Sequence, residues 1–458
     1  MHEQLIKELS EDLNSDQILT EEEDLLVYGF DGTAMLKEKP ACVVFPETAE
    51  QIQAVLMKAN KFGVPVVTRG SGTGLAGGSV PVVDGIVLCT VRMNKILEVD
   101  EKNMVMEVEP GVLTQQIADK ATSIDLFYPP DPGSIKISSI GGNIANNSGG
   151  LRGLKYGVTR DYVMALEIVL PDGRILKTGT RCVKDVAGYS LKDLFIGSEG
   201  TLGIITKVTL KLVPRPSAKK TMLVLFDSMT EAAEAVSMII ENKIIPCTLE
   251  FLDRVTIKCV EDYACIGLPT DCEAVLLVEV DGHSAEVADQ AQRIVSLVRS
   301  KGAREVRIAD SESEALKLAS ARRTAFSALA RLAPTVVLED ITVPRSKLAE
   351  MVAYISETAK RFDLRVGTFG HMGDGNLHPT FLCNERDKEE MHRVEEAMIL
   401  VFEYAISLGG TITGEHGVGL AKKPFLPGQV GNIGIEIMRQ VKKSFDPNGI
   451  LNPGKIFD

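Results

Sequence analysis

Two histidines seven positions apart lie in the segment of this chain whose composition is least suited to regular secondary structure. Residues 367–379 read GTFGHMGDGNLHP, so His371 and His378 stand among four glycines, one acid and one amide. Each glycine costs conformational entropy relative to alanine, and neither a helix nor a regular strand favours so many of them. We therefore expect an irregular bend with a histidine at each end, whose imidazoles can converge on one point.

A second glycine-flanked cluster carries a neighbouring acid and histidine. Residues 413–419 read TGEHGVG and contain Glu415 and His416. Two histidines and a carboxylate form a divalent-metal set that leaves coordination positions open for a substrate. His371, His378 and Glu415 are the predicted ligands of zinc, iron(II) or manganese. The competing interpretation makes the histidines polar turn residues and Glu415 a capping or ion-paired carboxylate.

Length and charge restrict the class of protein. A chain of 458 residues predicts two or three domains, and a formal net charge of −13 argues against nucleic acid or an anionic membrane as partner. The acidic start predicts no secretory signal, and no apolar run reaches the length of a membrane span. The eight cysteines contain no CxxC pair, which argues against an iron–sulfur cluster in this chain. We expect a soluble, cytoplasmic protein.

Elements that could position these residues begin with a helical lead-in, residues 1–37. A strand at 41–45 and a helix at 49–61, capped by Thr48, precede a glycine-rich loop that starts at Arg69. Gly72, Gly74 and Gly77 satisfy GxGxxG, but Pro81 and a strand-like run follow where a dinucleotide fold requires a helix. This loop is therefore predicted to bind phosphate through its backbone N–H groups, outside a Rossmann fold.

A second long glycine-rich loop, at residues 139–150, lies about seventy residues after the first, and the two suggest one extended ligand lying across a domain. Residues 197–203 form a third loop of small residues. A PDG turn predicts a hairpin over residues 164–178, and Pro214 with Pro216 marks a domain boundary. Beyond residue 221, short strands alternate with amphipathic helices at 229–242, 285–301, 348–362, 387–407 and 433–445. This order predicts an α+β domain whose sheet carries helices on one face.

The three glycine-rich loops, the HMGDGNLHP segment and the terminal FDPNGILNPGKIF together resemble one family. This family comprises the FAD-linked 2-hydroxyacid dehydrogenases of the vanillyl-alcohol-oxidase (PCMH-type FAD) superfamily. Its members include D-lactate dehydrogenases and the flavin subunit of glycolate oxidase. The resemblance implies a two-lobed FAD-binding domain at 38–217 and an α+β cap domain with an antiparallel sheet at 218–410. A C-terminal helical segment, 411–458, would return to the FAD domain.

The resemblance also implies a flavin site. Its predicted residues are Arg69, Gly70, Ser71, Gly72, Thr73, Gly74, Leu75, Pro130, Asp131, Pro132, Gly133, Ser134, Gly141, Gly142, Asn143, Asn147, Ser148, Gly150, Gly157, Asp161, Ser198, Glu199, Gly203, Ile204 and Asn452. Some relatives attach FAD covalently through a histidine of the first loop, but this chain has no histidine between His2 and His283. Non-covalent FAD is therefore expected.

The implied reaction is oxidation of a small 2-hydroxy acid, with D-lactate to pyruvate as the first candidate. His416 would take the hydroxyl proton, and Arg322, at the position of a carboxylate-binding arginine in relatives, would hold the substrate. The competing interpretation makes Arg322 a surface residue of a helix. An electron-transfer flavoprotein or an iron–sulfur subunit is the predicted electron acceptor, and direct reaction with oxygen or a quinone is the alternative. Glycolate or D-2-hydroxyglutarate as substrate, a metal-free flavin oxidase and a flavin electron-transfer subunit remain the alternatives.

Overall fold

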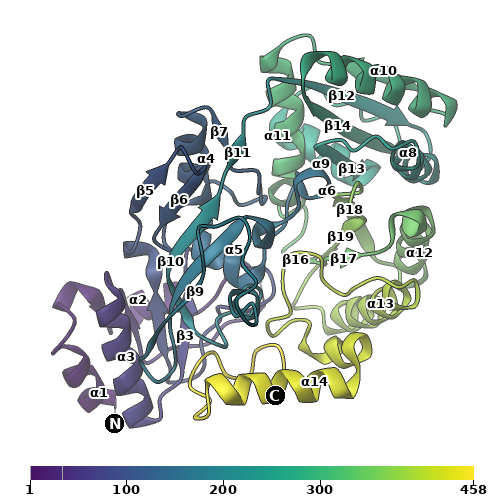
Figure 1. Ribbon diagram of the computed structural model, residues 1–458. Helices are drawn as coiled ribbons and strands as arrows, with labels where there is room; N and C mark the ends of the chain where they lie inside the picture. Colours follow the sequence, from purple (N-terminus) through teal and green to yellow (C-terminus); the bar gives the residue numbers. More distant parts are fainter. Residues whose placement is uncertain (1, 34) are drawn as a thin grey trace. The chain divides into compact units, whose positions relative to one another are not determined.

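The computed structural model describes residues 2–33 and 35–458, which form two compact units (Figure 1). Unit 1 comprises three chain segments: Met1–Ser148, Val158–Arg215 and Glu415–Asp458. Unit 2 comprises Gly149–Gly157 and Pro216–Gly414. Nine residues thus leave the first unit after Ser148 and belong to the second, a detour that the sequence does not predict.

The first sheet of unit 1 has the strand order β1-β2-β4-β3, formed by Ile18–Leu19, Cys42–Val44, Ile86–Cys89 and Val66–Arg69. β2 and β3 both run parallel to β4. Helix α3 (Ala49–Phe62) begins where Thr48 accepts the Gln51 N–H and ends at Gly63 with φ +63°, as its cap residues predict. The lead-in is not purely helical, because β1 follows helix α1 (His2–Leu9) and pairs with β2.

A second, antiparallel sheet of unit 1 has the order β5-β6-β10-β8-β9. Its strands are Ile96–Asp100, Val105–Val108, Ile204–Lys211, Val163–Val169 and Ile175–Gly179, and β8–β9 is the predicted hairpin. A small pair joins β7 (Leu126–Phe127) and β11 (Val213–Pro214). The remaining helices are α2 (Glu22–Val27), α4 (Thr114–Thr122), α5 (Ile140–Asn146), α7 (Lys192–Phe195) and α14 (Leu426–Phe445), the last kinked at Gly431.

Unit 2 is built on one large sheet with the order β15-β12-β14-β13-β18-β19-β16, while β17 also pairs with β19. Its strands are β12 (Ala218–Phe226), β13 (Thr248–Asp253), β14 (Ala274–Gly282), β15 (Glu305–Ile308), β16 (Thr335–Leu338), β17 (Ile341–Thr342), β18 (Arg365–Gly370) and β19 (Asn376–Cys383). All of these pairings are antiparallel, so the predicted α+β class with an antiparallel cap sheet is confirmed.

Helices cover both faces of this sheet, and the prediction of a single covered face is wrong. Helices α9 (Arg254–Ala264) and α11 (Glu312–Leu329) share a core with Leu223 and Leu225 of β12. Helices α8 (Met229–Glu241) and α10 (Ser284–Ser300) pack against β12 and β14 from the other side (Figure 1). The unit also contains α6 (Gly153–Tyr156), α12 (Leu348–Arg361) and α13 (Lys388–Ser407). No helix within residues 2–33 and 35–458 is long and apolar enough to cross a membrane.

Two glycine-rich segments are more regular than their composition predicts. Residues 367–379 form most of the β18–β19 hairpin, in which Phe369 pairs with His378, and only residues 371–375 make the turn. Residues 140–146 form helix α5, although two of them are glycine. In both segments, contacts with neighbouring elements outweigh the entropic cost of glycine.

Candidate active site

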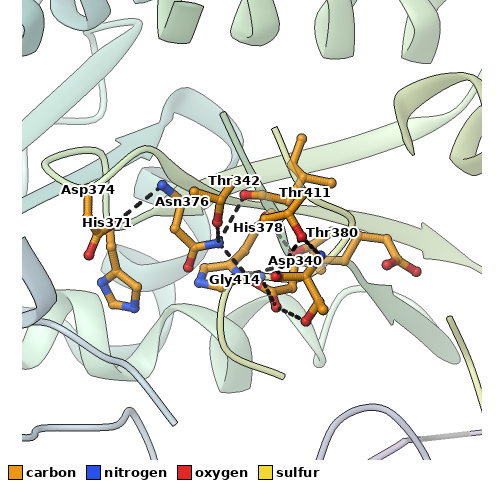
Figure 2. A network of polar contacts seen from close by, with 12 residues as sticks. Asp340, Thr342, His371, Asp374, Asn376, His378, Thr380, Thr411 and Gly414 are labelled. Carbon is orange, nitrogen blue, oxygen red and sulfur yellow. Dashed lines mark hydrogen bonds and ion pairs between the residues drawn. The ribbon is translucent and has the colours of Figure 1, made fainter. Parts of the chain in front are cut away.

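The β18–β19 hairpin places both predicted metal-ligand histidines inside unit 2 (Figure 2). His371 directly follows β18, and His378 lies in β19. Their rings are buried, their centroids are 5.4 Å apart, and their planes are nearly perpendicular. The structure therefore brings these two imidazoles together, as the sequence predicts.

The turn between the histidines depends on glycine. Gly375 has φ +93°, and a Cβ at this position would lie 2.1 Å from the Val343 carbonyl oxygen. The N–H groups of Asp374 and Asn376 both point to the His371 carbonyl, at 3.3 and 3.1 Å. Only glycine permits this close approach, so the turn fixes the separation of the histidines.

Glu250 of β13 orients His371. One carboxylate oxygen lies 2.7 Å from His371 Nδ1, and the other accepts the Nε–H of Arg322 at 2.5 Å. Glu250 is fully buried, and the sequence analysis did not identify it. A carboxylate at Nδ1 favours the tautomer with its lone pair on Nε2, the arrangement that metal-binding histidines commonly have.

Arg322 comes from helix α11, which also was not predicted, and is 6% exposed. Its guanidinium stacks 4.6 Å from the Phe369 ring centroid, and its Nη2 lies 3.3 Å from His371 Nε2. The arginine is therefore a buried part of the histidine cluster and not a surface residue of the helix. Its role toward a substrate stays a prediction.

His378 and Asp340 organise the other side of the cluster (Figure 2). The Nδ1 atom of His378 lies 3.2 Å from the Glu339 carbonyl oxygen and 3.8 Å from an Asp340 carboxylate oxygen. Asp340 also accepts the Asn376 side-chain amide at 2.7 Å, the Thr413 hydroxyl at 2.7 Å and the Gly414 N–H at 2.8 Å. No role was predicted for this fully buried acid, although the two acids 339–340 directly after the apolar residues 336–338 are a recognisable signal.

Glu415 and His416 follow Gly414 directly and open the last segment of unit 1. The carbonyl of His416 accepts the Asn146 side-chain amide at 3.3 Å within that unit. Their roles as metal ligand and proton acceptor stay predictions.

The predicted flavin residues are distributed over several loops of unit 1. Arg69 donates to the carbonyls of Phe30 and Tyr28, and burial lowers the pKa of its guanidinium. A Cβ on Gly70 would lie 2.0 Å from Ser139 Oγ, so the first glycine-rich loop and the start of α5 approach closely. Among the predicted residues, Gly150 and Gly157 belong to unit 2, and Ile204 is a core residue of β10; a role of these three at the flavin stays a prediction.

Several side chains of these loops have hydrogen-bonding capacity that the described residues do not use. Buried atoms without a partner include Thr68 Oγ1, Arg69 Nε, Ser139 Oγ and Asn452 Oδ1. The hydroxyl of Tyr128 is a further such atom, and its residue was not among the predicted ones. Burial raises the Tyr128 pKa, which keeps the hydroxyl a proton donor. Unused buried polar groups beside glycine loops fit a phosphate-containing cofactor such as FAD.

Comparison with known proteins identifies the class to which this fold and site belong. Residues 40–179 match the family described as "FAD binding domain", and residues 215–456 match "FAD linked oxidases, C-terminal domain". The chain belongs to the FAD-linked oxidase family, and the predicted family and FAD cofactor are confirmed.

Individual relatives and solved structures are similar over nearly the whole chain. "Glycolate oxidase subunit GlcD" of Bacillus subtilis is 53% identical over 94% of this chain and 92% of its own length. "D-lactate dehydrogenase" of Anaerostipes hadrus is 37% identical over 98% of this chain and 93% of its own. The structure of p-cresol methylhydroxylase with substrate bound aligns with a TM-score of 0.83 at 17% identity, over 100% of this chain and 97% of that one, which shows a shared fold.

Proposed function

We propose that this chain uses FAD to oxidise a small 2-hydroxy acid to the corresponding 2-keto acid. D-lactate, giving pyruvate, is the first candidate substrate, and glycolate is the second because the 53% identical relative is named for it. The observation that carries the proposal is the buried cluster of His371, His378, Arg322 and Glu250 in the C-terminal domain of an FAD-linked oxidase.

The chemistry of the histidines suits a divalent cation. Each Nδ1 faces an oxygen acceptor, Glu250 for His371 and the Glu339 carbonyl for His378, which directs both Nε2 lone pairs to ligand roles. Glu415 would complete the set for zinc, iron(II) or manganese. Such an ion would act as a Lewis acid and lower the pKa of the substrate hydroxyl.

Side chains of the protein would bind the acid and move its proton. Arg322 would hold the substrate carboxylate through its Nη groups, of which Nη2 also lies 3.3 Å from His371 Nε2, while its Nε donates to Glu250. His416 would accept the hydroxyl proton, as an imidazole can near neutral pH. The α-hydrogen then leaves carbon with its electron pair, and the carbon–oxygen bond becomes a carbonyl. FAD, bound non-covalently, supplies the acceptor for this hydride.

Reduced flavin must be reoxidised, and an electron-accepting partner protein is part of the proposal. An electron-transfer flavoprotein or an iron–sulfur subunit has suitable chemistry. The word "subunit" in the name of the 53% identical relative supports a partner. The eight cysteines contain no CxxC pair, so we propose that the electron acceptor is a separate protein.

The test is anaerobic bleaching of the flavin absorbance in the purified protein. D-lactate, L-lactate, glycolate and D-2-hydroxyglutarate are added separately, with and without prior chelation. We expect one acid to bleach the flavin, chelation to abolish the effect, and added metal to restore it. His378→Ala should behave like the chelated protein, whereas His392→Ala, which alters a histidine with a 71% exposed side chain, should behave like wild type.

The alternatives give different results. Bleaching that survives chelation and the His378 substitution would indicate a metal-free flavin oxidase. No bleaching by any of the acids, in metal-replete protein loaded with FAD, would refute the dehydrogenase. Flavin reduction by a redox protein alone would then identify an electron-transfer subunit.

A further inference from the structure

The segment that follows Glu415 is held against the end of helix α5 and two loops of unit 1. The side-chain amide of Asn146 donates to the His416 carbonyl, and the Leu420 N–H donates to the Ala76 carbonyl at 2.8 Å. Between these two points, the N–H groups of Val418 and Gly419 donate to the two carboxylate oxygens of Glu199, each at 2.7 Å. One buried side chain therefore binds two consecutive peptide groups of this segment.

The backbone of Glu199 is itself fixed. Its N–H donates to the Ala145 carbonyl at 2.8 Å, and its carbonyl accepts the Asn452 side-chain amide at 2.7 Å. Glu199 has φ +51°, a conformation that non-glycine residues seldom adopt and that a surrounding structure must stabilise. The carboxylate is thus presented from a rigid position and not from a mobile loop.

The bound segment has glycines where it approaches Glu199 and the first loop. Gly417 has φ +90°, and its Cβ would lie 3.0 Å from the nearer carboxylate oxygen of Glu199. Gly419 has φ +48°, and its Cβ would lie 2.1 Å from the Ala76 carbonyl oxygen. These glycines allow contact that any larger residue would prevent.

The electrostatic surroundings favour an ionised carboxylate more than burial alone would. Burial raises the pKa of Glu199 and is the largest influence; the two N–H donors and the cations Lys455 and Lys422 offset part of it, so that the pKa lies at about 7. Each oxygen accepts an N–H group of the segment, whereas the family resemblance implies a place for Glu199 in the flavin site.

We propose that Glu199 is a positioning residue that fixes the backbone after His416 and thereby orients its imidazole for proton transfer. This inference rests on the proposed role of His416. It assigns Glu199 to the catalytic segment in place of the cofactor site. Because hydrogen bonds to a charged group are among the stronger ones, losing one of the two should release the segment measurably.

The test combines amide hydrogen exchange with kinetics in the Glu199→Gln variant. A glutamine has one acceptor oxygen, and its NH₂ group would face a second N–H donor. We expect exchange at Val418 and Gly419, resolved to single residues by mass spectrometry, to accelerate by about 10-fold or more, as loss of a charged hydrogen bond implies. kcat should fall by a similar factor, about 10-fold, with KM and the flavin spectrum unchanged.

Glu167→Gln is the matched control, because Glu167 is a partly buried acid of β8 that accepts the Thr206 hydroxyl in the same unit. It should leave exchange at 418 and 419 and kcat unchanged. If Glu199→Gln does not fold, Gly417→Ala perturbs the same contact from the opposite side and should give the same pair of effects.

Each contrary outcome has a distinct meaning. Unchanged exchange at 418 and 419, or faster exchange with unchanged kcat, would overturn the positioning role. Loss of FAD with unchanged exchange would return Glu199 to the cofactor site. If wild-type protein oxidises no 2-hydroxy acid, the proposed function fails, whereas the exchange experiment still reports whether Glu199 holds the segment.

Discussion

Replacement of Glu250 by methionine should be far more damaging than replacement of Glu250 and Arg322 together. Glu250 is fully buried and Arg322 is 6% exposed. A carboxylate oxygen of Glu250 lies 2.5 Å from Arg322 Nε. Removing one member of a buried ion pair leaves a charge without compensation, which costs about 3–5 kcal/mol. Replacing both members by apolar residues of similar size is often neutral, because two desolvation costs disappear with the attraction.

Amide exchange in β13 and β18 measures this locally, since a chain of two units does not unfold in one step. The cycle consists of Glu250→Met, Arg322→Met and the double variant. We expect the loss of opening free energy in the double variant to be smaller than the sum of the two single losses by at least about 2 kcal/mol, because charges in contact are coupled in such cycles. If each single substitution lowers the opening free energy by less than about 1 kcal/mol, the ion pair contributes no more than a solvent-exposed one, and the reasoning is refuted.

Two further predictions concern unit 2. Gly375→Ala should destabilise the hairpin turn by about 1–3 kcal/mol, because the residue has φ +93° and its new methyl would meet the Val343 carbonyl; unchanged amide exchange at Asn376 would contradict this. Burial raises the pKa of Asp253 to about 6 from an ordinary 3.8, although the N–H groups of Thr256 and Thr368 donate to its carboxylate. Between these values the folded state holds a proton that the unfolded chain has lost, so the unfolding free energy of unit 2 should fall by about 2 kcal/mol as the pH rises from 4 to 6. Asp253→Asn should remove most of the pH dependence of the thermal midpoint of unit 2 over that range. If the midpoint of the variant still falls as steeply with pH as that of wild type, Asp253 is not the source of the dependence.

Local signals in the sequence predicted elements best where a cap residue decides the boundary. Thr48 and Gly63 enclose α3, and Asp387 begins α13 by accepting the N–H groups of residues 389 and 390. In each of these interactions the two partners lie within four positions of each other, so a short window of the sequence contains both. Residues 367–379 and 140–146 were less predictable, because their regularity depends on partners distant in sequence. β18 is paired on both sides, with β13 and β19, and Gly141 packs against Pro110.

The candidate site shows the same distinction. His371 and His378 were found because they are close in sequence and surrounded by glycine. Glu250 is 121 residues from His371 and 72 from Arg322, so its role depends on strand order and cannot be inferred from spacing. Its one local signal is an acid between Leu249 and Phe251 in an apolar strand, where a charged residue needs a buried partner.

The TGEHGVG segment combines these local and distant determinants. Asp340 of unit 2 accepts the Thr413 hydroxyl and the Gly414 N–H at its start. Glu199 of unit 1 accepts the two N–H groups at its end. Each of these anchors is a buried carboxylate that holds peptide N–H groups, an interaction that specifies backbone position without requiring a particular side chain in the segment. The backbone that carries Glu415 and His416 is therefore held by acids about 75 and 217 residues earlier in the chain, and not by residues of the segment itself.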